Sequence, residues 1–167
     1  TNDGTGTASY TSSLTSLSPE TLHYYRAYAT NEVGTVYGAE LTFRTLSNPP
    51  TAQASGLNAS ASSSSNINLS WSAATFPVSG ATTTGYVLLR ATSPNTPSLG
   101  NGNGAAPTAG TNTTIVSSSI SGAATSAASS TLASGTTYNY LLVPFTWDGT
   151  NATTYNYLTA SAPTATA

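Results

Sequence analysis

The chain has 167 residues, only 5% of them charged, a formal net charge of -2 at pH 7, and no cysteine or methionine. Three arginines and no lysine cannot neutralise many phosphates, so the composition argues against nucleic-acid binding. With no thiolates, a single histidine (His23) and five scattered acids, we expect no metal site and no cofactor. No apolar run approaches the ~20 residues that span a bilayer, so we expect no membrane insertion by this segment. Serine and threonine fill 58 positions, and this hydroxyl-rich, charge-poor composition favours an extracellular or cell-surface setting.

The first predicted element is a β-hairpin within residues 23–45. Its first strand is rich in tyrosine, residues 31–34 form a turn, and apolar residues alternate again in the return strand. Tyr24, Arg26 and Tyr28 should share one face of the first strand, with the arginine stacked between the rings. We interpret that arrangement as a surface or sheet-to-sheet contact.

A proline pair, Pro49-Pro50, follows the hairpin. Proline cannot donate to a sheet ladder and restricts the residue before it. We therefore expect residues 47–50 to form a short, stiff linker between two domains.

The remaining residues carry the signals of several short strands. Ile67, Leu69 and Trp71 alternate with polar residues, as in a strand that buries one face. Further strands are expected at 52–57, 86–89, 115–120 and 138–142, and in a stretch that ends at residue 132. After an Asp148-Gly149 turn, a return strand is expected at 155–159. Residues 93–112 are a loop long enough to suggest function or mobility. Strands at intervals of about ten residues predict an all-β antiparallel sandwich.

An internal repeat supports this architecture. Residues 17–25 align without gaps with residues 132–140, since both read leucine, a turn, threonine and then aromatic residues at alternate positions. The repeated unit resembles fibronectin type III domains, in the form common in bacterial secreted and cell-surface proteins. The resemblance implies a buried tryptophan on the second strand, matched by Trp71, and a corner tyrosine that bonds to nearby backbone, matched by Tyr138. In the first copy His23 takes the corner position, and we expect its imidazole to bond to backbone there.

The resemblance implies tandem sandwiches of which the first is incomplete. Residues 1–46 supply only the last three strands, whereas residues 51–167 supply a complete set. We expect the chain to be part of a longer array cut inside a repeat; alternatively, a neighbouring chain donates the missing strands. The core of the complete unit should contain Trp71, Tyr86, Leu88, Tyr138 and Tyr140.

The sequence offers no catalytic constellation, so we expect no enzyme activity. The only histidine lies at a strand start and no nucleophile-elbow motif occurs. Five residues near the last hairpin could together stack on and hydrogen-bond a sugar, although a purely structural role is the simpler interpretation: Trp147, Asp148, Asn151, Tyr155 and Tyr157.

We therefore expect a non-catalytic spacer or adhesive segment of a secreted or cell-surface multi-repeat protein. Its partners would be other repeats of the same protein or neighbouring subunits, with surface glycans as a further candidate. Two alternatives stay open. One is an accessory, carbohydrate-binding module of a secreted enzyme, and the other is a β-sandwich subunit of an extracellular filament or sheath.

Overall fold

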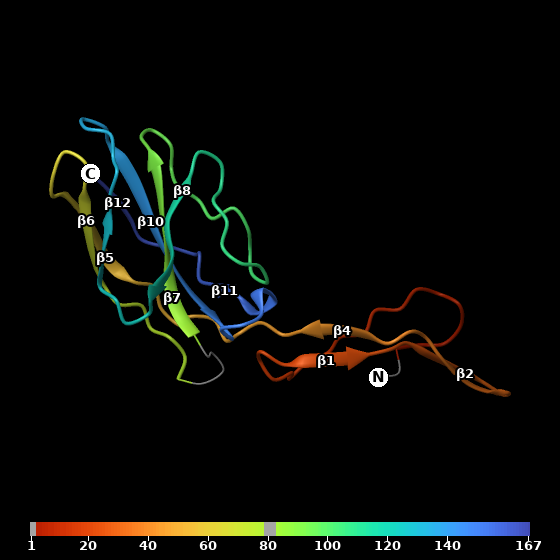
Figure 1. Ribbon diagram of the computed structural model, residues 1–167. Helices are drawn as coiled ribbons and strands as arrows, with labels where there is room; N and C mark the ends of the chain where they lie inside the picture. The colour runs from red at the N-terminus through yellow and green to blue at the C-terminus, as the bar shows by residue number, and fades with distance from the viewer. Residues whose placement is uncertain (1–2, 79–82) are drawn as a thin grey trace.

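The computed structural model of the chain describes residues 3–78 and 83–167, and within them nearly all regular structure is β (Figure 1). A two-part hairpin comes first and a sandwich follows. The hairpin strands are β1 (Leu22–Tyr25), β2 (Tyr28–Asn31), β3 (Gly34–Tyr37) and β4 (Leu41–Arg44). The later elements are β5 (Ser55–Ala61), β6 (Ile67–Ser72), β7 (Thr83–Thr92), β8 (Thr114–Ser121), β9 (Ser126–Ser129), β10 (Tyr138–Trp147), the 3-10 helix η1 (Ala152–Thr154), β11 (Asn156–Tyr157) and β12 (Thr164–Thr166).

Two antiparallel sheets form the sandwich. One has the order β5-β6-β9, and the other has the order β11-β10-β7-β8 with β12 also paired to β10. The long strands β7 and β10 pair over their full lengths, from Tyr138 opposite Thr92 to Trp147 opposite Thr83. Residues 51–78 and 83–167 therefore form an all-β antiparallel sandwich, as the sequence predicted.

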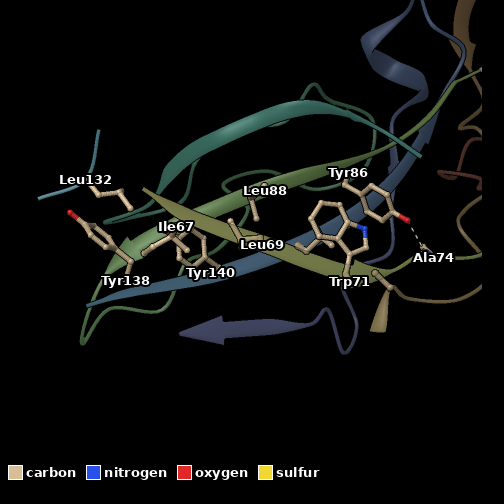
Figure 2. Close-up of a cluster of buried hydrophobic side chains, with 11 residues drawn as sticks. Ile67, Leu69, Trp71, Ala74, Tyr86, Leu88, Leu132, Tyr138 and Tyr140 are labelled. Carbon is tan, nitrogen blue, oxygen red and sulfur yellow. Dashed lines mark hydrogen bonds between the residues drawn. The ribbon is translucent and has the colours of Figure 1, made fainter. Parts of the chain in front are cut away.

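Alternation on β6 builds the core between the sheets. Ile67, Leu69 and Trp71 point inward and are at most 5% exposed, while the residues between them face solvent. They pack against β7 and β10 (Figure 2). The rings of Trp71 and Tyr86 meet edge to face at 5.6 Å, and burying each such side chain contributes about 1.5–3 kcal/mol. The five residues expected in this core are all buried there: Trp71, Tyr86, Leu88, Tyr138 and Tyr140.

A second apolar cluster covers the outer face of the larger sheet. Val87, Leu89, Val143 and Phe145 lie there beside the rings that follow β10. Strand β7 is thus buried on both faces, which explains why its middle is a continuous apolar run instead of an alternating one. Most small antiparallel sandwiches leave one such face in water, so this cover requires additional chain.

That cover comes partly from the long loop at residues 93–112, which is pinned. The Asn103 side chain accepts a hydrogen bond from the Tyr157 backbone amide (2.7 Å), and the Tyr157 hydroxyl donates to the Ala105 carbonyl (2.8 Å). The Gly100 amide donates to the Thr108 carbonyl at 2.8 Å. A Cβ on Gly100 would collide with the Ala109 backbone, so the two arms of this loop lie too close for a larger residue.

The predicted return strand at 155–159 is wrong in its extent. Asp148 accepts hydrogen bonds from the Thr150 and Asn151 amides (2.8 and 2.6 Å), so the chain makes a wider turn than a two-residue hairpin. Helix η1 and the two-residue strand β11 follow, and the main return strand is β12. Thr159 lies outside every strand.

The N-terminal hairpin repeats the end of the sandwich. Strand β1 pairs with β4 and β2 pairs with β3, as β10 pairs with β12 at its start and with β11 at its end. The corner residues differ. The Tyr138 hydroxyl accepts from the Ala133 amide at 3.0 Å, whereas His23 stacks on Phe43 with ring centroids 5.3 Å apart, and its buried Nε2 has no partner among the described residues. The expected backbone bond through this imidazole nitrogen is therefore absent there.

Candidate functional site

The five residues considered for sugar binding lie together at one end of the sandwich. The Trp147 and Tyr155 rings stack at 4.6 Å and 17°, and Tyr155 stacks in turn on Tyr157 at 5.6 Å and 12°. Asp148 and Asn151 form the adjoining turn. The structure thus places a three-ring stack beside a carboxylate and an amide.

This stack is not an open platform. Tyr155 and Tyr157 are only 7% and 5% exposed, and burial raises the pKa of both phenols. Tyr157 also carries the hydrogen bonds that hold the long loop. Trp147 alone is partly exposed. The geometry therefore presents these rings mainly as packing for the outer apolar cluster.

The turn consumes the polar groups of the same set. Burial alone would raise the pKa of the Asp148 carboxyl, but hydrogen bonds from Asn151 and Thr150 outweigh it and lower this pKa. The Asn151 side-chain amide donates to the Asp148 carboxylate at 2.6 Å. These groups are engaged with each other, which leaves few of their donors and acceptors for a ligand.

The most elaborate polar site lies where the hairpin joins the sandwich. Ser47 is 2% exposed. Its amide donates to the Thr154 carbonyl (2.9 Å), and its own carbonyl accepts from the Asn156 side chain (2.7 Å). The Thr146 hydroxyl donates to the Asn48 carbonyl at 2.6 Å. The segment expected to form a short, stiff linker, residues 47–50, is thus hydrogen-bonded into the sandwich through Ser47 and Asn48.

The hairpin side of this joint is fixed as well. The Ser47 hydroxyl donates to the Glu20 carboxylate (2.6 Å), and the Glu20 amide donates to the Leu46 carbonyl (3.2 Å). Arg44 donates to the Glu20 carbonyl at 2.8 Å. One buried serine, Ser47, therefore links the base of the hairpin to η1 and β11. In Figure 1 the chain passes directly from β4 into this end of the sandwich.

Sequence reasoning did not single out the joint residues. Thr146 and Asn156 are polar residues, 0% and 8% exposed; Thr146 follows the apolar and aromatic run at 140–145, and Asn156 lies between Tyr155 and Tyr157. A polar side chain within such a run is a signal for a buried hydrogen bond. The partner, however, lies about a hundred positions earlier in the chain, and no local pattern connects the two.

The hydrogen-bonded polar side chains at both sites are hydroxyl and amide groups, together with one carboxylate at each site, Asp148 and Glu20, and the Arg44 guanidinium at the joint. Among residues 3–78 and 83–167, no three histidine, cysteine or acidic side chains gather where they could hold a metal ion. Over the same ranges no helix is long and apolar enough to cross a membrane.

Comparison with known proteins found similarity among solved structures alone. No family model matches the sequence, and no curated protein matches it. Among solved structures, the chain is similar to the FN1-FN3 domains of chicken CNTN1, with 17% identity and a TM-score of 0.45 over 89% of this chain and 42% of that one. It is also similar to domains d3-d4 of the rat CD45 extracellular region, with 15% identity and a TM-score of 0.37 over 93% of this chain and 71% of that one.

A titin segment is similar at 16% identity with a TM-score of 0.41, over 85% of this chain and 38% of that one. The chain spans less than half the length of the CNTN1 and titin structures. Scores this low leave the assignment of the sandwich to the chain's own strand order, described above.

Proposed function

We propose that this chain is a non-catalytic structural segment that holds two β units in a fixed relative orientation within a multi-repeat protein. The joint at Ser47 carries the proposal. A flexible linker leaves its backbone in water, whereas this one buries its backbone and pairs it with Asn156, Thr146 and Thr154.

The hairpin supports the same function. Because it repeats the β10, β11 and β12 arrangement, we regard it as the closing part of a further sandwich, with domain limits of 1–46, 47–50 and 51–167. The charge-poor, hydroxyl-rich surface fits an extracellular or cell-surface setting, in which modules are spaced by covalent connection. Adhesion, and a subunit role in a filament or sheath, are narrower versions of this proposal.

A spin-label distance measurement tests the rigid joint. Because the chain has no cysteine, Val33→Cys in the hairpin turn and Ala128→Cys on β9 take labels at those two sites alone. Both positions are exposed, Val33 at 96%. We expect one narrow distance distribution between the labels. A broad distribution in the parent chain would contradict the proposal.

Asn156→Leu supplies the matched perturbation. It keeps the side-chain size but leaves the buried Ser47 carbonyl unpaired, at a cost of about 1–3 kcal/mol. The label distribution should broaden while the sandwich stays folded by circular dichroism. Asn66→Leu, in the turn between β5 and β6, serves as the control and should leave the distribution unchanged.

A further inference from the structure

The outer face of the hairpin differs from the corresponding face of the sandwich. When the internal sequence alignment is extended, Arg26, Tyr28 and Thr30 of the hairpin are equivalent to Leu141, Val143 and Phe145 of β10. In the sandwich, those three residues pack in the outer apolar cluster, and Val143 and Phe145 are 1% and 2% exposed. An arginine and a threonine at these positions indicate a hairpin face made for water or a ligand instead of a covering loop.

This face carries an aromatic pair with a cation on it. The guanidinium carbon of Arg26 lies 4.0 Å from the centroid of the Tyr37 ring, and Tyr28 and Tyr37 are neighbours at 6.2 Å. From the sequence we expected Arg26 to stack between Tyr24 and Tyr28, but the ring it contacts is that of Tyr37 on β3. Tyr28 and Tyr37 are 54% and 56% exposed, and the Thr30–Thr35 hydroxyl pair (2.8 Å) extends the same face.

Arg26 is exposed, and within the described residues its guanidinium has no hydrogen bond or ion pair. It can therefore donate to a ligand lying across the rings. Tyrosine faces carry negative potential and attract polarised C–H groups. A pyranose ring offers C–H groups on its face and hydroxyl acceptors at its rim, so it matches both features.

The charge of the hairpin favours a neutral polysaccharide over an acidic one. Residues 22–44 contain two arginines, Arg26 and Arg44, and two acids, Glu32 and Glu40, so this hairpin has no net charge. An anionic polymer would meet the glutamates together with Arg26. We propose that Tyr28, Tyr37 and Arg26 form a binding face for an extended, uncharged polysaccharide. This proposal is independent of the rigid joint.

Titrating the full chain with hexaoses of β-1,4-linked glucose, mannose or xylose tests the proposal. Amide chemical shifts should move for residues 24–37 and not for residues 147–157, with at least one hexaose, at concentrations up to about 10 mM. Polygalacturonate serves as the acidic comparison and should bind more weakly. The proposal fails if no hexaose shifts the hairpin, or if polygalacturonate binds more tightly.

Variants at one position separate stacking from folding. Tyr37→Phe keeps the ring and should retain affinity, whereas Tyr37→Leu keeps the apolar bulk and should lose about tenfold. Tyr25→Ala is the control, because Tyr25 contacts Phe43 instead of the Tyr28–Tyr37 pair, and it should bind as the parent does. Equal affinity of the Tyr37→Phe and Tyr37→Leu variants would overturn the role of the ring. If both Tyr37 variants lose affinity and also lose the amide chemical shifts of the folded hairpin, the hairpin needs the Tyr37 hydroxyl to fold. In that case the stacking role is rejected.

Discussion

Two buried tyrosines, Tyr86 and Tyr140, should differ in how much stability the protein loses when their hydroxyl groups are removed. The Tyr86 hydroxyl accepts a hydrogen bond from the Ala74 amide at 2.7 Å, and both residues are buried. In Tyr86→Phe the ring keeps its edge contact with Trp71, but the amide loses its acceptor. A buried unpaired donor costs about 1–3 kcal/mol, so the free energy of unfolding should fall by that amount.

Tyr140→Phe is the matched case. Tyr140 is 0% exposed, and its hydroxyl makes no hydrogen bond within the described residues. Ser129 lies beside it, and the Ser129 hydroxyl accepts a hydrogen bond from Arg90 at 3.0 Å. Burial raises the pKa of this phenol, as expected for a poorly solvated hydroxyl. Its removal should leave stability unchanged or raise it by up to about 1 kcal/mol.

Urea unfolding followed by tryptophan fluorescence measures both variants. The slope with urea should match the parent, so that the change in midpoint reports stability directly. Equal destabilisation by the two substitutions would refute the reasoning, because it would mean that the hydrogen bond to Ala74 does not distinguish these tyrosines.

Three further outcomes are expected. Gly85→Ala should destabilise the sandwich by about 1–3 kcal/mol in the same urea assay, because the new methyl group would lie 2.6 Å from the Ile120 carbonyl oxygen; an unchanged midpoint would mean that β8 moves freely. The pKa of the Asp148 carboxyl is lowered on folding, so its stabilising effect is complete above the unfolded-state value of about 3.9 and is lost as the pH falls through the folded value; Asp148→Asn should flatten the decline of the urea midpoint below about pH 4, and an identical decline would contradict this. Trp147→Ala should lower stability without changing binding of the neutral hexaoses, because the Trp147 ring stacks on Tyr155; loss of glycan binding would return the sugar site to that end of the sandwich.

The fold class could be predicted because the decisive signals are local. Alternation at Ile67, Leu69 and Trp71 requires one buried face, and the Tyr138 corner follows a short motif. The expected first strand at 52–57 begins later, at Ser55, as β5. Alanine, serine and glycine make up most of residues 52–57, and they fix a strand boundary weakly.

Other features depend on partners that are distant in sequence. The fixed position of the 93–112 loop depends on hydrogen bonds to Tyr157, and the joint depends on Thr146 and Asn156. The sugar-binding hypothesis for residues 147–157 chose suitable residue types, but composition does not show that two of those rings face the protein. Predicting the exposed Tyr28–Tyr37 pair would have required the cross-strand register. That register shifts by one residue within the hairpin, because residues 26–27 on one strand lie across from residues 38–40 on the other, and the sequence does not reveal this shift.

The way β10 is anchored has a mechanical consequence. The joint attaches to Thr146 near one end of this strand, and β12 pairs with residues 139–141 near the other. Tension between the hairpin and β12 would thus run along β10 and shear its ladder with β12, loading the hydrogen bonds of that ladder together instead of one at a time. A segment connected in this manner would transmit pulling forces as a stiff tie.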